Sequence, residues 1–73
     1  MRNNDITWSR NLFAALNEGG TWCVPRSGLV FNKRGGALVL ITRLPGFDSA
    51  EQESDLDAIA AHFSAAGIEV RHA

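Results

Sequence analysis

The first part of the chain spaces its apolar residues as one face of an α-helix would. That face carries Trp8, Leu12, Ala15 and Leu16. The i, i+4, i+7, i+8 pattern predicts an amphipathic helix over residues 8–18. Asp5 or Thr7 can cap its start through a side-chain oxygen, and the Gly19-Gly20 pair is expected to end it. Phe13 lies about 100° from the centre of the stripe, so it is either exposed or widens the face that packs into the core, and we favour the wider face.

Short segments rich in β-branched and aromatic residues follow, separated by residues that favour turns. They predict three strands, at residues 21–24, 28–33 and 37–44. Pro25 has no amide hydrogen and ends the first strand, and the RGG sequence at 34–36 makes a tight turn before the third. The third strand is apolar at consecutive positions, 38–41, so it is either covered on both faces or leaves one apolar face for a partner.

A second amphipathic pattern predicts a helix over residues 48–67. Its apolar face carries Leu56, Ile59, Ala60 and Phe63. Either Asp48 with Glu51, or Ser49 with Gln52, fits a capping box at the start of this helix. The acidic first turn also suits the positive end of the helix dipole.

Gly67 is expected to end the second helix, because glycine readily adopts the left-handed conformation that closes a helix. In that arrangement Ile68 packs back on Phe63. Residues 68–70, with the sequence IEV, can then form a short edge strand.

Together these elements predict an α+β fold in the order α-β-β-β-α, with a three-stranded antiparallel meander, two packed helices and room for a short C-terminal strand. The length of 73 residues allows one domain, 1–73, and we expect flexible ends at residues 1–5 and 71–73. The composition, with 45% apolar and 21% charged residues, is that of a folded globular protein. Because the one cysteine cannot form an intramolecular disulfide, stability must come from apolar packing.

Charge is unevenly distributed along the chain, although the net charge is only −1. Residues 1–47 carry six basic and two acidic side chains, a net charge of +4, whereas residues 48–73 carry one basic and six acidic side chains, a net charge of −5. Such asymmetry orients encounters with charged partners. No apolar run approaches the roughly 20 residues that span a bilayer, and the start MRNND does not resemble a secretory signal, so we expect a cytosolic protein.

The side chains that could carry chemistry each have a simpler structural interpretation. They are Cys23, His62, His72, Glu51, Glu53, Asp55 and Asp57. In a predicted strand, Cys23 fits a buried small side chain better than a reactive thiol, and neither histidine has an evident orienting partner. The carboxylates lack the pattern of a calcium loop and suit the start of a helix. We therefore expect no enzymatic activity, no metal and no cofactor, and a protein that works by binding another macromolecule.

Basic residues near the predicted turns form the candidate partner-binding site, together with one residue of the second strand. They are Arg26, Lys33, Arg34, Arg43 and Val30. The four basic residues can share one rim, which contacts nucleic-acid phosphates, stays solvated, or contacts an acidic or amphipathic protein surface. We favour protein contact, because arginine is enriched at interface hot spots and no aromatic ladder of the RNA-binding kind is present.

Over most of its length the chain resembles the small transcription regulators that lytic Xanthomonas phages direct against the RNA polymerase of their host. The segments that carry the resemblance are Trp8 with NLFAALNEGGTW (11–22), VPRSGLVF (24–31) and HFSAAGIEV (62–70). The resemblance implies a non-enzymatic, monomeric protein in the cytoplasm of the infected bacterium. It implies binding to bacterial RNA polymerase at the N-terminus of the β′ subunit, near the β flap, with nucleic acid contacted only indirectly.

Two outputs are implied by the same resemblance, namely weaker promoter recognition by the σ-containing holoenzyme and readthrough of terminators by the elongating enzyme. Two alternatives stay open. One is a phage protein that inhibits another host or defence protein, and the other is a small nucleic-acid-binding module.

Overall fold

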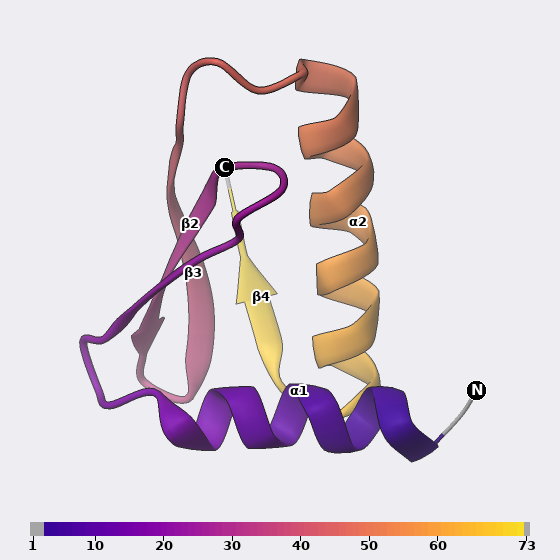
Figure 1. The fold of residues 1–73 in the computed structure, drawn as a ribbon. Coiled ribbons are helices and arrows are strands. Elements are labelled where there is room, and N and C mark those ends of the chain that lie inside the picture. The colour runs from indigo at the N-terminus through magenta and orange to yellow at the C-terminus, as the bar shows by residue number, and fades with distance from the viewer. Residues whose placement is uncertain (1–2, 73) are drawn as a thin grey trace.

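The computed structural model describes residues 3–72, with side chains from Ile6 onward, and in this range it contains two helices and one four-stranded sheet (Figure 1). The elements are α1 (Asn3–Ala15), β1 (Thr21–Cys23), β2 (Leu29–Arg34), β3 (Ala37–Arg43), α2 (Ser49–Ala65) and β4 (Glu69–Arg71). The strand order is β1-β2-β3-β4, and the first three strands are antiparallel neighbours. β4 runs parallel to β3, which requires a crossover, and α2 supplies it. The predicted α+β fold is confirmed, including the C-terminal strand.

The first helix starts and ends earlier than the apolar pattern predicted. It spans Asn3–Ala15 instead of 8–18, so the prediction that Asp5 or Thr7 caps its start is wrong, because the helix includes both positions. The apolar stripe begins at Trp8, whereas the helix starts earlier, over residues 3–7, in which Ile6 is the one apolar residue. Residues 1, 2 and 73, which belong to the ends expected to be flexible, lie outside the described residues.

Lys33 of β2 occupies the C-terminal end of α1. Its Nζ atom donates hydrogen bonds to the carbonyl oxygens of Phe13 at 2.8 Å and Leu16 at 2.9 Å. The ammonium group also lies 4.2 Å from the centre of the Phe13 ring. A cation at this position binds carbonyl oxygens at the end of the helix and is favoured by the helix dipole. The helix therefore ends before the glycine pair that was expected to stop it.

The three predicted strands agree with the structure to within one residue at each end. The turn between β2 and β3 places Gly35 at φ 57° and Gly36 at φ 79°, a left-handed pair that glycine adopts without strain. The pairing shifts between Val30 and Phe31, which marks a β-bulge in the β2–β3 ladder.

Both predicted ends of α2 are confirmed. The Asp48 side chain caps the helix by accepting a hydrogen bond from the Glu51 amide at 3.0 Å. At the other end, the Ile68 amide donates to the Phe63 carbonyl and the Gly67 amide to the Ser64 carbonyl, both at 2.9 Å. With Gly67 at φ 80°, this is the Schellman arrangement, and it places Ile68 in the core beside Phe63.

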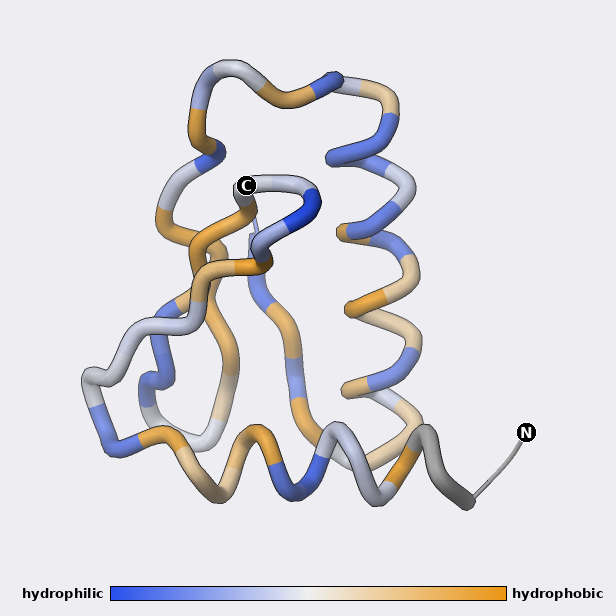
Figure 2. Tube along the Cα trace, viewed as in Figure 1, coloured by the Kyte–Doolittle hydropathy of each residue, from blue (hydrophilic) through white to orange (hydrophobic). Residues whose placement is uncertain are grey.

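The core lies between one face of the sheet and the helices, with α1 crossing one end of the layer. Its buried members are Leu29, Phe31, Leu38, Leu56, Ile59, Phe63 and Ile68. In Figure 2 the apolar positions of α2 lie on the side that faces the strands. Phe13 is half-buried and packs against this core, which confirms the wider apolar face of α1. No helix among the described residues is both long enough and apolar enough to cross a membrane.

Cys23 was expected to be buried, and this prediction is wrong because its thiol is exposed. Side chains alternate along a strand, and Trp22 and Phe31 point toward the core, so Cys23 and its partner Val30 lie on the opposite face of the sheet. On β3, Leu38 is buried whereas Ile41 is 49% exposed. Of the two interpretations of this apolar strand, the one that leaves an apolar face uncovered is therefore correct.

Candidate partner-binding surface

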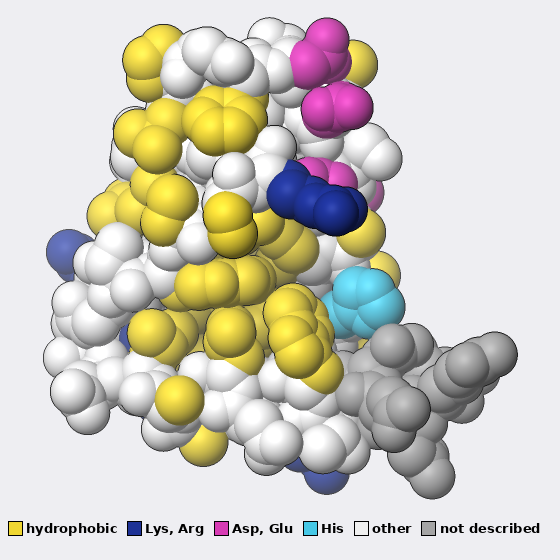
Figure 3. Space-filling view, viewed as in Figure 1, with side chains coloured by type: hydrophobic (Ala, Val, Ile, Leu, Met, Phe, Trp, Pro, Cys, Tyr) yellow, Lys and Arg dark blue, Asp and Glu magenta, His cyan; other side chains and the backbone are white. Residues whose placement is uncertain are grey.

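A groove of about 450 Å³ lies between α1, the β1 end of the sheet and α2. We call it the aromatic groove, and its lining residues are Trp8, Leu12, Trp22, Val24, Pro25, Arg26, Asp55, Ala58 and Ile59. In Figure 3 apolar side chains continue across the same face of the molecule, from the sheet to α1. The surface is apolar except for one basic and one acidic side chain.

The groove exists because one helix cannot cover four strands. Strands lie about 4.8 Å apart, so the outer strands of this sheet are roughly 14 Å apart, whereas a helix with its side chains is about 10 Å wide. α2 packs beside β4, at the opposite end of the sheet from β1 (Figure 1). The inward side chains of β1 are therefore left partly uncovered.

Aromatic rings form the inner wall of the groove. Trp22 stacks on Phe31 with ring centres 5.5 Å apart and lies 5.8 Å from Phe63. Trp8 meets Trp22 edge-on at 6.0 Å and Phe63 at 5.6 Å. Such ring pairs favour fixed relative orientations, so this wall exists before any partner arrives. The Trp8 side of the cluster remains open, because this residue is 45% exposed.

Two opposite charges flank the groove. Arg26, in the loop after β1, makes no hydrogen bond or ion pair with its side chain among the residues that the structure describes, and the same holds for Asp55 of α2. An arginine without an intramolecular partner is available to bind a carboxylate with two parallel hydrogen bonds.

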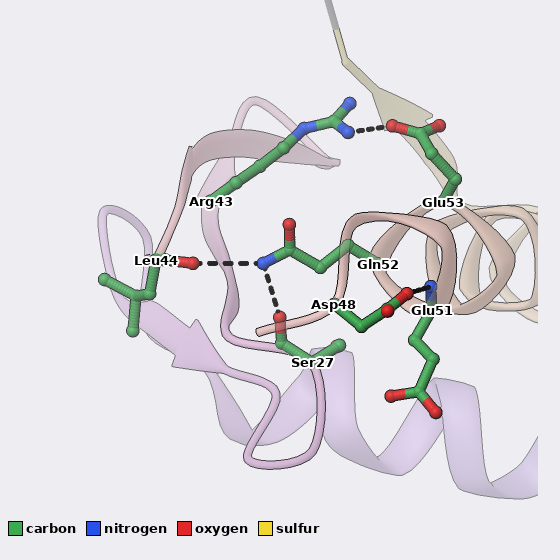
Figure 4. A network of polar contacts seen from close by, with 7 residues as sticks. All are labelled: Ser27, Arg43, Leu44, Asp48, Glu51, Gln52 and Glu53. Carbon is green, nitrogen blue, oxygen red and sulfur yellow. Dashed lines mark hydrogen bonds and ion pairs between the residues drawn. The ribbon is translucent and has the colours of Figure 1, made fainter. Parts of the chain in front are cut away.

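A buried glutamine fixes the loop that carries Arg26. The Gln52 side-chain amide donates to the Ser27 carbonyl at 2.7 Å and to the Leu44 carbonyl at 3.1 Å (Figure 4). The same loop is held by Phe47, whose ring would lie 2.5 Å from a Cβ atom at Gly28. These contacts tie the β1–β2 loop to α2 and to the segment before it, so the two walls of the groove keep their separation.

The structure does not bring the four predicted basic residues to one rim. Arg34 lies beside the turn that joins β2 to β3, whereas Arg43 pairs with Leu29 at the other end of the same ladder. Five residue steps along β2, from Leu29 to Arg34, separate the two positions, which is about 17 Å at 3.3 Å per step. The expectation of a shared rim is therefore wrong, because consecutive turns of an antiparallel meander lie at opposite ends of the sheet.

Three of these basic residues are engaged within the protein. Lys33 binds the end of α1, Arg34 donates to the Asn32 side chain at 2.7 Å, and Arg43 forms an ion pair with Glu53 (Figure 4). Val30 is half-buried on the sheet face opposite the helices. Of the predicted site, only Arg26 lies in the aromatic groove.

The side chains that could have served in catalysis or metal binding lie apart from one another. Cys23 is on the outer face of the sheet, and His62 of α2 is half-buried with its ring 6.2 Å from that of Trp8. The acidic residues of α2 are exposed, apart from Asp55, which is half-buried at the groove. Within residues 6–72, no group of three or more histidine, cysteine or acidic side chains is placed to hold a metal ion.

Sequence reasoning missed most of the groove. Trp8 and Leu12 were assigned to the core-facing stripe of α1, and Ala58 lies outside the stripe of α2. The signal present in the sequence was the pair of tryptophans, since large aromatic side chains with a polar edge are common at binding surfaces. Comparison of the chain with protein-family models, with curated proteins and with solved structures finds no match.

Proposed function

We propose that this protein is a non-enzymatic phage regulator that binds bacterial RNA polymerase through the aromatic groove. Its target site is the N-terminus of the β′ subunit, near the β flap. Binding weakens σ-dependent initiation and lets the elongating enzyme pass terminators. The protein acts as a monomer in the cytoplasm of the infected host.

The observation that carries the proposal is the groove itself. A preformed apolar surface with two tryptophans, and with an arginine that has no side-chain partner among the described residues, has the composition of an interface hot spot, in which a few buried anchors supply most of the affinity. The choice of polymerase as the partner is supported by the sequence resemblance. Direct recognition of nucleic acid is less favoured, because Lys33, Arg34 and Arg43 are engaged within the protein and do not form a basic surface.

A non-enzymatic regulator acts through a difference in its affinity for two states of the polymerase. A ligand shifts an equilibrium only as far as it binds one state more tightly than the other. The protein must therefore bind the polymerase more tightly when σ is not productively engaged, and it must stay bound during elongation. Both effects then follow from one binding site.

Two matched substitutions on α2 test the groove. Ala58 lines it and is exposed, whereas Ala61 is exposed on the same helix but does not line it. We expect Ala58→Arg to weaken binding to purified core polymerase by about tenfold or more, because the long side chain fills the groove. Ala61→Arg makes the same change of charge and helix propensity and is expected to leave the affinity within about twofold. Equal affinities for the two folded variants would show that the groove is not the contact surface.

The regulatory outputs are measured by transcription with purified components. Adding the protein is expected to reduce initiation by holoenzyme and to increase readthrough of an intrinsic terminator, and Ala58→Arg should lose both effects together. If the native protein does not bind polymerase, the proposal is wrong. Co-purification from a bacterial lysate then tests the alternative host target, and a steep dependence of DNA affinity on salt would identify a nucleic-acid-binding module.

A further inference from the structure

We propose that β1 accepts a short extended segment of the partner as a fifth strand, and that every second side chain of this segment enters the aromatic groove. The segment is apolar at those alternating positions and carries an acidic side chain that binds Arg26. This inference rests on the proposed function and specifies how the partner is bound.

The first reason is that the outer edge of β1 has no neighbouring strand within the described part of the chain. β1 ends the strand order and pairs with β2 alone among the described strands. The Gly20 carbonyl accepts from the Lys33 amide at 3.0 Å, and the Val24 amide donates to the Leu29 carbonyl at 2.8 Å, so these positions face β2. Because backbone groups alternate along an antiparallel strand, those of Thr21 and Cys23 point away from β2. They offer two amides and two carbonyls to an added strand.

The second reason is the position of the groove. Trp22 and Val24 of this edge point into it. The side chains of a neighbouring strand lie directly beside those of β1, alternating between the two faces. Every second residue of an added strand would therefore enter the groove. A space of about 450 Å³ holds a few side chains, whereas a helix with its side chains is about 10 Å wide, which favours an extended segment.

The third reason is charge. Arg26 directly follows this edge and has no partner among the described residues, so an acidic side chain at the corresponding end of the added strand completes the site. β4, the other edge of the sheet, carries exposed Glu69 and Arg71, which bond to each other at 3.1 Å. Charged side chains along an edge oppose strand addition. The exposed side chains of β1, Thr21 and Cys23, are uncharged.

A proline substitution tests the edge. The Cys23 amide points away from β2, so Cys23→Pro removes no hydrogen bond between β1 and β2, and proline is tolerated at such edge positions. Cys23→Ala is the matched control, since it removes the same thiol and keeps the amide. With purified RNA polymerase as the probe, we expect Cys23→Pro to bind about tenfold more weakly than Cys23→Ala. The amide spectrum of each variant reports whether it is folded.

A second measurement uses the unmodified protein and does not depend on the folding of a variant. On binding polymerase, the amides of Thr21 and Cys23 should become protected from hydrogen exchange, whereas the amide of Val70 in β4 should not change. Arg26→Glu should weaken binding about tenfold, and Arg10→Glu, a matched change on an exposed position of α1, should leave it within about twofold.

The possible failures are distinguishable. If polymerase binds but Cys23→Pro and Cys23→Ala are equally tight and the Thr21 and Cys23 amides exchange at unchanged rates, strand addition is wrong and the proposed function stands. If Arg26→Glu binds as tightly as Arg10→Glu, the acidic contact is wrong. A native protein that does not bind polymerase contradicts the proposed function, and this inference is then wrong as well.

Discussion

The two ends of the sheet use similar side chains for different purposes. At the β3–β4 end, α2 covers the strands, Leu38 and Leu56 are fully buried, and the outer strand carries an ion pair. At the β1 end, Trp22 is only half-buried and Trp8 is 45% exposed, and the outer strand is uncharged. The difference is coverage by a helix. Apolar residues stabilise the fold where α2 covers them, and where it does not they line the groove that we propose binds the partner.

The two ends of the sheet also differ in charge, because β4, at the end that α2 covers, carries Glu69 and Arg71. The hydrogen bond to Glu69, together with the charge of that carboxylate, raises the pKa of Arg71 above its ordinary value, so Arg71 keeps its positive charge at neutral pH. A charged edge of this kind resists pairing with other chains. The protein thus protects one edge of its sheet and leaves the other available.

The largest expected effect comes from the residue that joins both ends. Phe63 is fully buried and contacts the rings of Trp8 and Trp22. Phe63→Ala should lower the free energy of unfolding by about 3–5 kcal/mol, because it removes buried apolar surface and leaves a cavity. Urea denaturation followed by circular dichroism measures this loss. A loss below about 1 kcal/mol would show that the two ends do not share one core.

Next in size is the glutamine that holds the two walls of the groove together. Gln52→Met keeps the volume but leaves the carbonyls of Ser27 and Leu44 without their donor, at a cost of about 1–3 kcal/mol. The Ser27 and Gly28 amides should exchange faster, since the loop loses its tie to α2. If their exchange is unchanged and stability is retained, the loop is positioned without Gln52, by Phe47 and by backbone hydrogen bonds such as that from the Leu44 amide to the Gly28 carbonyl.

A smaller effect is expected where β2 meets α1. Lys33→Met removes the cation from the end of the helix and should cost about 1–2 kcal/mol. Arg10→Met, on an exposed position of α1 with no side-chain hydrogen bond or ion pair among the described residues, is the control and should cost less than about 0.5 kcal/mol. The same denaturation measurement applies to both variants, and equal losses would mean that Lys33 acts only as a surface charge.

The smallest effect should come from the ion pair between Arg43 and Glu53, whose side chains are 35% and 57% exposed. A double-mutant cycle should give a coupling of about 0–1 kcal/mol that decreases as salt is added. Coupling that exceeds this range and persists in salt would show that the covered end depends on electrostatics as well as on packing.

The fold was largely predictable because its signals are local. The β-branched runs, the glycine turn at Gly35-Gly36 and the caps at Asp48 and Gly67 each act within a few residues, and the structure confirms them. The end of α1 was not predictable, because Lys33 reaches it from a strand far along the chain. Long-range contacts of this kind leave no mark in a local pattern.

The candidate site was less predictable than the fold. Arg26, which was selected for its charge and its place in a turn, lines the groove. The exposure of Trp8 depends on which strands α2 covers, and that of Cys23 depends on which face of the sheet the helices cover. Strand order and the side on which a helix crosses are properties of the assembled sheet. Periodicity identifies an apolar face without saying whether another element covers it.

The tryptophans of the aromatic groove allow partner binding to be followed by the intrinsic fluorescence of the protein. The chain has two tryptophans and no tyrosine, and both indoles line the groove, so its ultraviolet emission arises almost entirely from this surface. A partner that displaces water from Trp8 will shift that emission to shorter wavelength without any attached dye. Occupancy can therefore be followed in real time, in the native protein, at the place where the partner is expected to lie.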